Sequence, residues 1–180
     1  MPVTPLADRA VPAVAAAGEA CVLLKLGEIV LKGGNRQQFE RMLQSNIRRA
    51  IRDIGIPVRF WQRDGVIVIR AAQDTPAPAA ASAADKVAER ARDIMGIARV
   101  CRAVRVAKDP DAAVGAAVTL MAGKTGSFAV RARRRDKRFP VTSAELATRI
   151  GARVQQEYGY PVNLSRPDTA LFVEVDQREV

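Results

Sequence analysis

Residues 57–70 read PVRFWQRDGVIVIR, and this stretch predicts a β-hairpin at the centre of the first domain. Residues 57–63 and 66–70 are rich in β-branched and aromatic side chains, which favours two strands. Between them, Asp64-Gly65 is the dipeptide typical of a type I′ turn, which joins neighbouring antiparallel strands. The segments on either side then decide what sheet the hairpin belongs to.

A strand and an amphipathic helix are expected before the hairpin. Residues 20–26 (ACVLLKL) form an apolar run typical of a buried strand. Asn35, with Gln38 three residues later, forms a capping-box arrangement, and Gly55 supplies the end signal of the helix. The apolar residues between these signals recur at intervals of three and four: Phe39, Met42, Leu43, Ile47, Ile51 and Ile54.

A second helix and a fourth strand are expected after the hairpin. Residues 71–81, which include PAPAAA, are interpreted as a loop, and Ser82 is expected to cap a helix that ends at Gly96. Residues 97–106 form the last strand. The order β-α-β-β-α-β is that of the ferredoxin-like fold and predicts a first domain over residues 20–106.

A smaller α/β domain is expected over residues 107–180, making the whole chain α+β. Asp109-Pro110 is an N-cap followed by proline at the first helical position. A strand over 127–133, a helix over 142–158 and a strand over 169–175 follow. The sequence stops soon after that strand, so the domain is expected to be truncated at its C-terminal end.

The two ends of the chain and its apolar runs bear on location. Residues 1–19 are rich in Ala, Pro and Val, but prolines and charges interrupt them, so they are interpreted as a disordered tail instead of a signal peptide. No apolar run approaches the roughly 20 residues of a membrane span. We therefore expect a cytoplasmic protein with no membrane partner.

The composition favours a polyanionic partner. Twenty-nine Lys and Arg against 19 Asp and Glu give a net charge of +10 and a pI near 10.6. Because Arg and Ala are both abundant, compositional bias is an alternative source of this charge. The absence of histidine excludes His-based catalysis, and Cys21 and Cys101 are too far apart in sequence to suggest a zinc site. No catalytic or metal-binding residue is assigned.

The densest basic segment is RARRRDKR at residues 131–138, with six cations and one anion. Alternation along a strand would place Arg131, Arg133 and Arg135 on one exposed ridge, with Arg134 on the other face. Such a ridge can bind phosphates; the alternative is an ordinary solvated surface. The candidate RNA-binding residues here are Arg131, Arg133, Arg134, Arg135, Lys137 and Arg138.

A helix start follows the basic segment directly. Thr142 and Ser143 offer hydroxyl groups and helical N–H groups to a phosphate. Phe139 could stack on an unpaired base, and an equally good interpretation is an anchor in the core. All three are candidate RNA-binding residues.

Two further surfaces are weaker candidates. A Gly-rich turn with flanking cations could hold a phosphate, although an ordinary strand-to-helix turn is at least as good an interpretation; its candidates are Lys32, Asn35 and Arg36. On residues 57–63, Trp61 lies between two arginines on one strand face, where packing against the other domain is favoured over base stacking.

Two segments of the sequence resemble a known family. Residues 26–39, LGEIVLKGGNRQQF, are similar to the opening of the bacterial tRNA 4-thiouridine synthetases, the tRNA uracil 4-sulfurtransferases. Residues 128–140, FAVRARRRDKRFP, resemble a THUMP domain, whose signature could begin near residue 84. The pattern continues through Thr142-Ser143, Glu145, Gly151, Val162-Asn163-Leu164, Pro167-Asp168 and Val173-Glu174-Val175.

The resemblance implies a function. Its ferredoxin-like and THUMP domains would hold the acceptor stem and 3′ end of tRNA for a separate pyrophosphate-loop domain. That domain, which these 180 residues lack, would use ATP and Mg²⁺ and accept sulfur relayed from a cysteine desulfurase. The family implies homodimers and, in some members, a link to thiamine biosynthesis. Alone, this chain is expected to bind tRNA with no cofactor of its own.

Three other functions remain open at this point. The chain could be a THUMP-type RNA-binding module serving another RNA-modifying enzyme, such as a methyltransferase. It could be a complete RNA-modifying enzyme, but neither a pyrophosphate loop nor a GxGxxG fingerprint is present. It could also be a non-enzymatic basic interaction protein.

Overall fold

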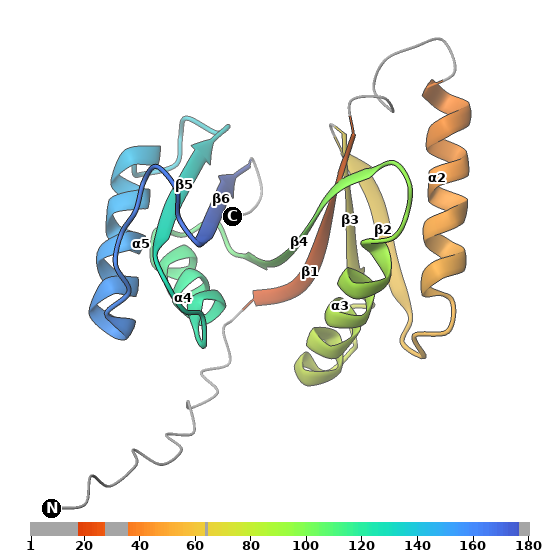
Figure 1. Cartoon of the computed structure of the whole chain (residues 1–180), viewed down its shortest axis with the longest axis horizontal. Helices are drawn as coiled ribbons and strands as arrows, with labels where there is room; N and C mark the ends of the chain where they lie inside the picture. Colours follow the sequence, from red (N-terminus) through yellow and green to blue (C-terminus); the bar gives the residue numbers. More distant parts are fainter. Residues whose placement is uncertain (1–17, 28–35, 64, 177–180) are drawn as a thin grey trace, which may run out of the picture.

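The computed structural model describes residues 18–27, 36–63 and 65–176, and it divides them into two domains side by side (Figure 1). The first domain has the predicted order of elements: β1 (Gly18–Leu26), α2 (Arg36–Ile51), β2 (Val58–Arg63), β3 (Val66–Ala71), α3 (Ala77–Ala91) and β4 (Ile97–Val106). The second has α4 (Pro110–Met121), β5 (Phe128–Arg134), α5 (Ser143–Tyr158) and β6 (Thr169–Val175).

The first domain is ferredoxin-like, as predicted. Its strands form one sheet in the order β2-β3-β1-β4, and each pair of neighbours is antiparallel. Helices α2 and α3 cover the same face of the sheet, because alternate residues of the central strands pack with both helices in one core. That core includes Leu24 of β1, Ile67 of β3, Ile47 of α2 and Val87 of α3, each at most 1% exposed.

Two boundaries of the first domain correct the sequence predictions. Strand β1 begins at Gly18, so the last two residues of the expected 1–19 tail are in a strand; the rest of that tail lies outside the described residues. The expected loop at 71–81 is wrong, because α3 begins at Ala77. Proline is tolerated in a first helical turn and alanine is the best helix former, so PAPAAA can start a helix.

The central hairpin has the predicted pairing. Arg63 pairs with Val66, and Gly65 has a φ of +78°, the left-handed conformation that the turn requires. Asp64 and the expected helix cap Asn35 both lie outside the described residues, so the structure does not describe their part in these turns.

The second domain has a two-stranded parallel sheet covered on one face by two helices. Strands β5 and β6 pair from Phe128 opposite Thr169 to Arg134 opposite Val175. Leu171 and Val173 face α4 and α5, where they pack with Ile150 in a second core. The opposite face of the sheet carries no helix among the described residues.

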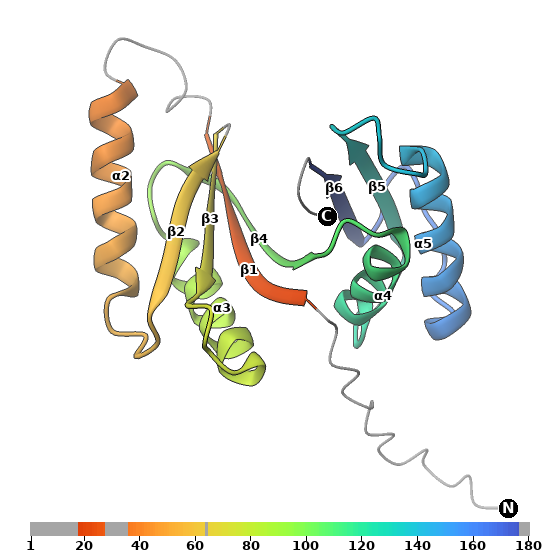
Figure 2. The same ribbon diagram turned by 180° about the vertical axis from the view of Figure 1, so that it is seen from behind.

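The open face of the β5–β6 sheet lies next to the first domain. Figure 1 and the reverse view in Figure 2 both show β5 and β6 between α5 and the β1–β4 pair. Residues 107–109 alone connect β4 to α4. Across the boundary, Lys25 Nζ lies 3.6 Å from Glu174 Oε1. None of the described helices is long and apolar enough to cross a membrane.

Candidate nucleic-acid interface

The predicted arginine ridge is present on the open face of β5. Arg131, Arg133 and Arg135 are exposed, whereas Arg134 is half-buried on the opposite face. The parallel register places Arg131 beside Phe172 and Arg133 beside Glu174 on the neighbouring strand. The alternation of a strand therefore produces the ridge, as expected from the sequence.

Arg134 has a different environment from its neighbours. Its Nη1 atom donates hydrogen bonds to the carbonyl oxygens of Phe139 and Val141, at 3.1 and 3.0 Å. The guanidinium thus holds the turn between β5 and α5 in place. We assign Arg134 a structural contact within the chain, although the sequence also suggested it for RNA.

Asp136 organises the same turn as a buried anion. The residue is 6% exposed, and its carboxylate accepts hydrogen bonds from Lys108 Nζ, from the Arg138 backbone N–H at 2.9 Å, and from Arg138 Nε and Nη2. Hydrogen bonds from Arg138 and then Lys108 hold the pKa of Asp136 far below its ordinary value of 3.8. The one anion of the basic segment therefore fixes the orientation of Arg138, whose side chain remains 83% exposed.

Phe139 is a core residue, which corrects the stacking interpretation. It is 3% exposed and packs in the second core with Met121 and Leu146. A base cannot reach a ring at that depth. The turn alternates between buried and exposed side chains. Asp136 and Phe139 are buried, whereas Lys137 and Arg138 between them are exposed.

Helix α5 begins with the predicted capping box. Thr142 Oγ1 accepts a hydrogen bond from the Glu145 N–H at 3.2 Å, and Glu145 Oε2 accepts one from the Thr142 N–H at 2.7 Å. Hydrogen bonding of the Glu145 carboxylate to Thr142, first of all to its backbone N–H, holds the pKa of Glu145 below its ordinary value. Ser143 is the first helical residue and is half-buried. The Thr142 side chain therefore bonds within the chain as a helix cap, and the start of α5 lies next to the basic turn.

A structured loop flanks the other end of the ridge. Arg131 Nη2 donates a hydrogen bond to the carbonyl oxygen of Leu164, 3.1 Å away, and the Leu164 side chain is 70% exposed. Asp168 holds the same loop, because its Oδ2 atom accepts hydrogen bonds from both the backbone N–H and the hydroxyl of Ser127, each at 2.7 Å. Arg131 is thus fixed at its tip while remaining exposed.

The structure describes the two weaker candidate surfaces, the Gly-rich turn and the strand that carries Trp61, to different extents. Lys32 and Asn35 lie outside the described residues, and Arg36 is the first residue of α2. Trp61 is half-buried on the sheet face away from the helices, with the Arg70 guanidinium carbon 5.8 Å from its ring centre. Trp61 is not among the residues that line the cleft between the domains, and its packing against the other domain stays a prediction.

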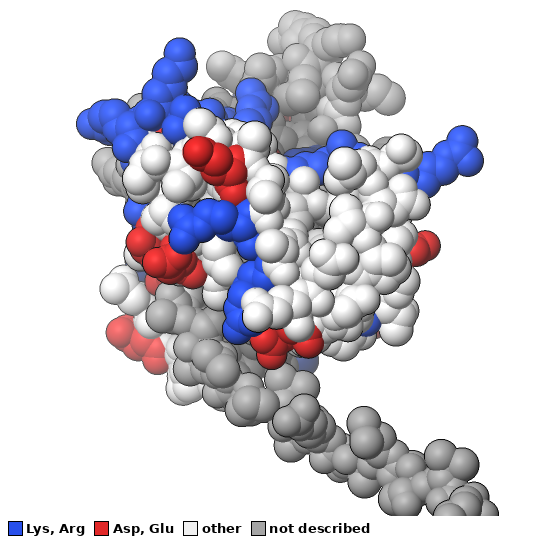
Figure 3. All heavy atoms as spheres, turned by 90° about the vertical axis from the view of Figure 1, so that its left-hand side faces the viewer, with Lys and Arg blue, Asp and Glu red and all other residues white. Residues whose placement is uncertain are grey.

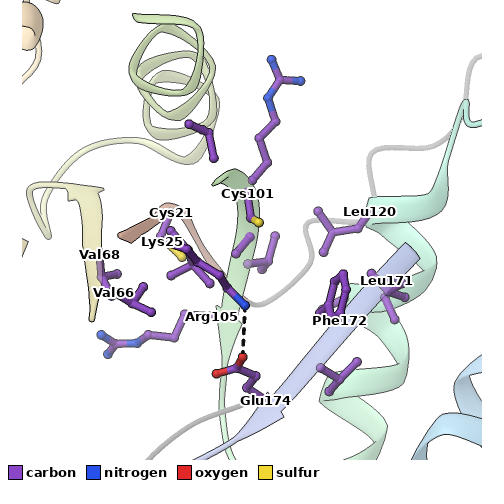
Figure 4. Close-up of a pocket in the computed structure, with 18 of the residues that line it drawn as sticks. Cys21, Lys25, Val66, Val68, Cys101, Arg105, Leu120, Leu171, Phe172 and Glu174 are labelled. Atoms are coloured by element: carbon purple, nitrogen blue, oxygen red, sulfur yellow. Dashed lines mark ion pairs between the residues drawn. The ribbon is translucent and has the colours of Figure 1, made fainter. Parts of the chain in front are cut away.

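A cleft of about 740 Å³ separates the open faces of the two sheets. Strands β1, β3 and β4 form one wall, and β6 with α4 forms the other; Figure 4 shows side chains from both walls pointing into it. Phe172 is 46% exposed at this cleft. The centre of its ring lies 5.5 Å from Lys25 Nζ and 5.8 Å from the Arg99 guanidinium carbon.

Phe172 is the exposed aromatic side chain of this face, and it is not among the residues predicted from the sequence. In the strand 169–175 (TALFVEV), Leu171, Val173 and Val175 alternate as the buried positions. The same alternation assigns Phe172 to the outward face with Glu174, so the signal was present in the sequence. Phe139 directly follows the basic segment 131–138 in the sequence, and that position made it the predicted aromatic residue.

Basic side chains concentrate at one end of the second domain. Figure 3 views the molecule from the side of that domain and shows Lys and Arg along its upper margin, the end toward which β5 points in Figure 1. No group of three or more His, Cys, Asp or Glu side chains that could hold a metal ion occurs within the described ranges. The arrangement suits binding of an anionic polymer.

Comparisons with known proteins match the two domains separately. The family model of the ThiI ferredoxin-like domain matches residues 21–101, and that of the THUMP domain matches residues 111–180. The chain is 40% identical over 168 residues to a probable tRNA sulfurtransferase of Nocardia farcinica, and 33% identical over 163 residues to one of Listeria innocua. These alignments cover 89% and 88% of the chain but 38% of each relative.

Solved structures share the two-domain arrangement. A 4-thiouridine synthetase in complex with RNA and ATP matches with a TM-score of 0.67 and 23% identity, over 89% of this chain and 39% of that one. TrmN from Thermus thermophilus matches with a TM-score of 0.57 and 21% identity, over 89% of this chain and 43% of that one. At these identities the likeness concerns the fold. The chain spans about 38% of the length of the curated relatives that it matches.

Proposed function

The chain belongs to the ThiI ferredoxin-like and THUMP families over residues 21–101 and 111–180, and we propose that it is the tRNA-binding part of a tRNA sulfurtransferase. In this proposal the two domains hold the acceptor stem and 3′ end of a tRNA in which a uridine becomes 4-thiouridine. The chemistry would be carried out elsewhere in such an enzyme. We assign no catalytic residue to this chain.

The exposed arginine ridge is the observation that carries the proposal. Arg131 and Arg133 lie on a sheet face with no helix over it among the described residues, and Lys137 and Arg138 continue the basic surface past the end of β5. Side chains of this kind contact phosphate oxygens and position a protein on a duplex without reading its sequence. An A-form stem suits such contacts because it is recognised mainly by shape and phosphate.

Other parts of the proposal follow from the family and concern partners and cofactors. ATP and Mg²⁺ would bind a pyrophosphate-loop domain, not the residues discussed above. A cysteine desulfurase would supply sulfur to that domain, and two copies would act together on one tRNA in the cytoplasm. A contribution to thiamine biosynthesis would use the same sulfur relay.

The second candidate is a THUMP-type module that serves a different RNA-modifying enzyme. The observation in its favour is the fold likeness to TrmN, because TrmN and the 4-thiouridine synthetase share this arrangement of domains although they carry different names. The match of residues 21–101 to the ThiI type of ferredoxin-like domain favours the sulfurtransferase. Both candidates predict RNA binding by the described surface.

The test is binding of this chain to unmodified tRNA, with the 3′ end intact or trimmed, by fluorescence anisotropy at two salt concentrations. We expect tighter binding to the intact tRNA and a steep loss of affinity with salt, because several phosphates are contacted. Equal affinity for the intact and trimmed forms would contradict recognition of the end. Equal affinity for tRNA and for an unrelated duplex DNA would favour a generic basic surface.

A further inference from the structure

Phe172 combines three properties that a buried or an ordinary surface aromatic residue lacks. Its side chain is 46% exposed, it projects from β6 into the cleft between the domains, and cations approach its ring from the opposite wall (Figure 4). Those cations are Lys25 and Arg99, which are paired residues on β1 and β4. Both domains therefore contribute to its surroundings.

The charges around the Phe172 ring favour binding of an anionic ligand. Lys25 is paired with Glu174, so one positive and one negative charge cancel there. Arg99 has no ion pair with any described residue, and Arg131 donates its hydrogen bond to an uncharged acceptor, the Leu164 carbonyl oxygen. Arg131 lies beside Phe172 in the register of the sheet. The exposed ring thus has the Arg99 guanidinium carbon 5.8 Å from its centre and Arg131 beside it in the register, and no ion pair to a described residue neutralises either charge.

We propose that Phe172 is a stacking platform for one unpaired nucleotide of the bound RNA, with Arg99 and Arg131 placed to hold its phosphates. The inference deepens the proposed function, on which it rests, by naming the side chain that receives the single-stranded end. An exposed aromatic ring flanked by cations is the arrangement with which proteins bind single-stranded nucleic acid, because every base has a face that can stack. A double-stranded stem keeps its bases stacked on each other and offers no free face.

The position of the ring fits a path along the open face of the second domain. The arginine ridge would carry the phosphates of the stem, and Phe172 lies one strand further, at the edge facing the first domain. An RNA end that leaves the ridge in that direction enters the cleft. Phe139, the aromatic residue suggested by sequence, cannot serve, because it belongs to the core.

The direct test places 2-aminopurine, a fluorescent adenine analogue, at successive positions of a 3′ overhang on an RNA hairpin. Stacking on an aromatic ring quenches its fluorescence, so we expect quenching at one overhang position when the chain binds. Phe172→Leu keeps an apolar side chain of similar length but removes the ring, and it should abolish this quenching. Phe172→Trp should retain it.

Affinity gives a second readout. Phe172→Leu should weaken binding of the overhang hairpin by about 5- to 140-fold, the range for losing one stacked base, and leave a blunt hairpin unaffected. The slope of affinity against salt should not change, because the ring contacts no phosphate. Met42→Ala, which removes a side chain that is 54% exposed on α2, is the matched control and should change neither RNA.

The outcomes separate this inference from the proposed function. If the unaltered chain binds neither hairpin, both are wrong. If it binds the overhang hairpin but Phe172→Leu leaves affinity and quenching unchanged, Phe172 is a contact between domains only, and the proposed function stands without it. Absence of quenching at every overhang position in the unaltered chain would also overturn the inference, independently of how any variant folds.

Discussion

Arg133 is the simplest residue on which to test the ridge, because it is exposed at the centre of the ridge. We predict that Arg133→Ala weakens tRNA binding and reduces the slope of log affinity against log salt by roughly 0.7–0.9, the effect of losing one phosphate contact. Thermal unfolding should be unchanged. Arg153→Ala is the matched control: Arg153 pairs with Glu157 on α5, so its loss should leave the slope as it was. Equal slopes for all three proteins would place the RNA elsewhere.

Phe139 is expected to matter for stability and not for recognition. Phe139→Ala removes a 3% exposed ring from the second core and should lower the free energy of unfolding by about 3–5 kcal/mol. Urea denaturation measures this change. Without urea, and at a temperature where the variant remains folded, its affinity for the overhang hairpin should equal that of the unaltered chain. A large loss of affinity with normal stability would return Phe139 to the RNA surface.

Asp136 makes stability depend on acid. Its pKa is lower in the folded protein than the ordinary 3.8, so the ionised carboxylate stabilises the fold above about pH 4, and this contribution disappears as pH falls further toward the folded pKa. Asp136→Asn should therefore unfold at lower temperature than the unaltered chain at pH 7. The difference should shrink below pH 4.

Thermal melts of both proteins from pH 7 to pH 2.5 test this dependence. Asp85→Asn is the control, because Asp85 is 59% exposed and pairs with Arg102 at the surface. It should change the melting temperature little at any pH. A difference between Asp136→Asn and the unaltered chain that stays constant through acid would rule out the carboxylate as its source.

At the scale of elements, the start of α5 joins stability to the basic turn. Thr142→Ala removes the side-chain acceptor of the capping box and should lower the free energy of unfolding by about 1 kcal/mol, whereas Thr142→Ser should retain it. Urea denaturation of the three proteins measures the difference. Equal stabilities would show that the Glu145 side chain or solvent satisfies the helix start unaided.

The elements themselves were largely predictable from the sequence, since their signals are local. The hairpin 57–70 and the capping box at Thr142 each depend on a few neighbouring residues. The start of α3 differs from the predicted one because a proline indicates a loop unless its position in the first helical turn is known. The alternation of the ridge was also local, and it was confirmed.

The parts of the site that sequence did not give depend on tertiary structure. Whether Phe139 or Phe172 is open to a base depends on which face of the second sheet the helices cover. The approach of Lys25 to Glu174 joins residues almost 150 positions apart, and no periodicity records such a contact. The role of Arg134 likewise requires the path of the turn that it holds.

At the scale of the whole molecule, the ion pair between the domains should influence their relative position. Lys25→Glu would place two carboxylates where Lys25 Nζ and Glu174 Oε1 are now 3.6 Å apart, and would also remove the cation beside Phe172. We predict a larger radius of gyration in small-angle X-ray scattering, with little change in melting because a partly exposed pair contributes at most about 1 kcal/mol.

The exchanged pair provides the check. Lys25→Glu combined with Glu174→Lys should restore the original radius of gyration, since the attraction is re-formed with its signs reversed. Lys86→Glu, at an exposed position of α3, makes the same change of net charge away from the cleft and should have no effect. An unchanged radius in Lys25→Glu would show that other contacts fix the domains.

The junction between the domains also limits how the chain can be dissected. Gly18 at the start of β1 pairs with Val106 at the end of β4, and Lys108 in the three-residue connection contacts Asp136 in the second domain. A cut after Val106 would keep the β1–β4 pairing in the first piece and leave Lys108 with the second. A cut after Lys108 would separate Lys108 from Asp136, which would lose one of its cationic partners. A fragment that contains the second domain alone should therefore begin at residue 107, the residue directly after β4 of the first domain.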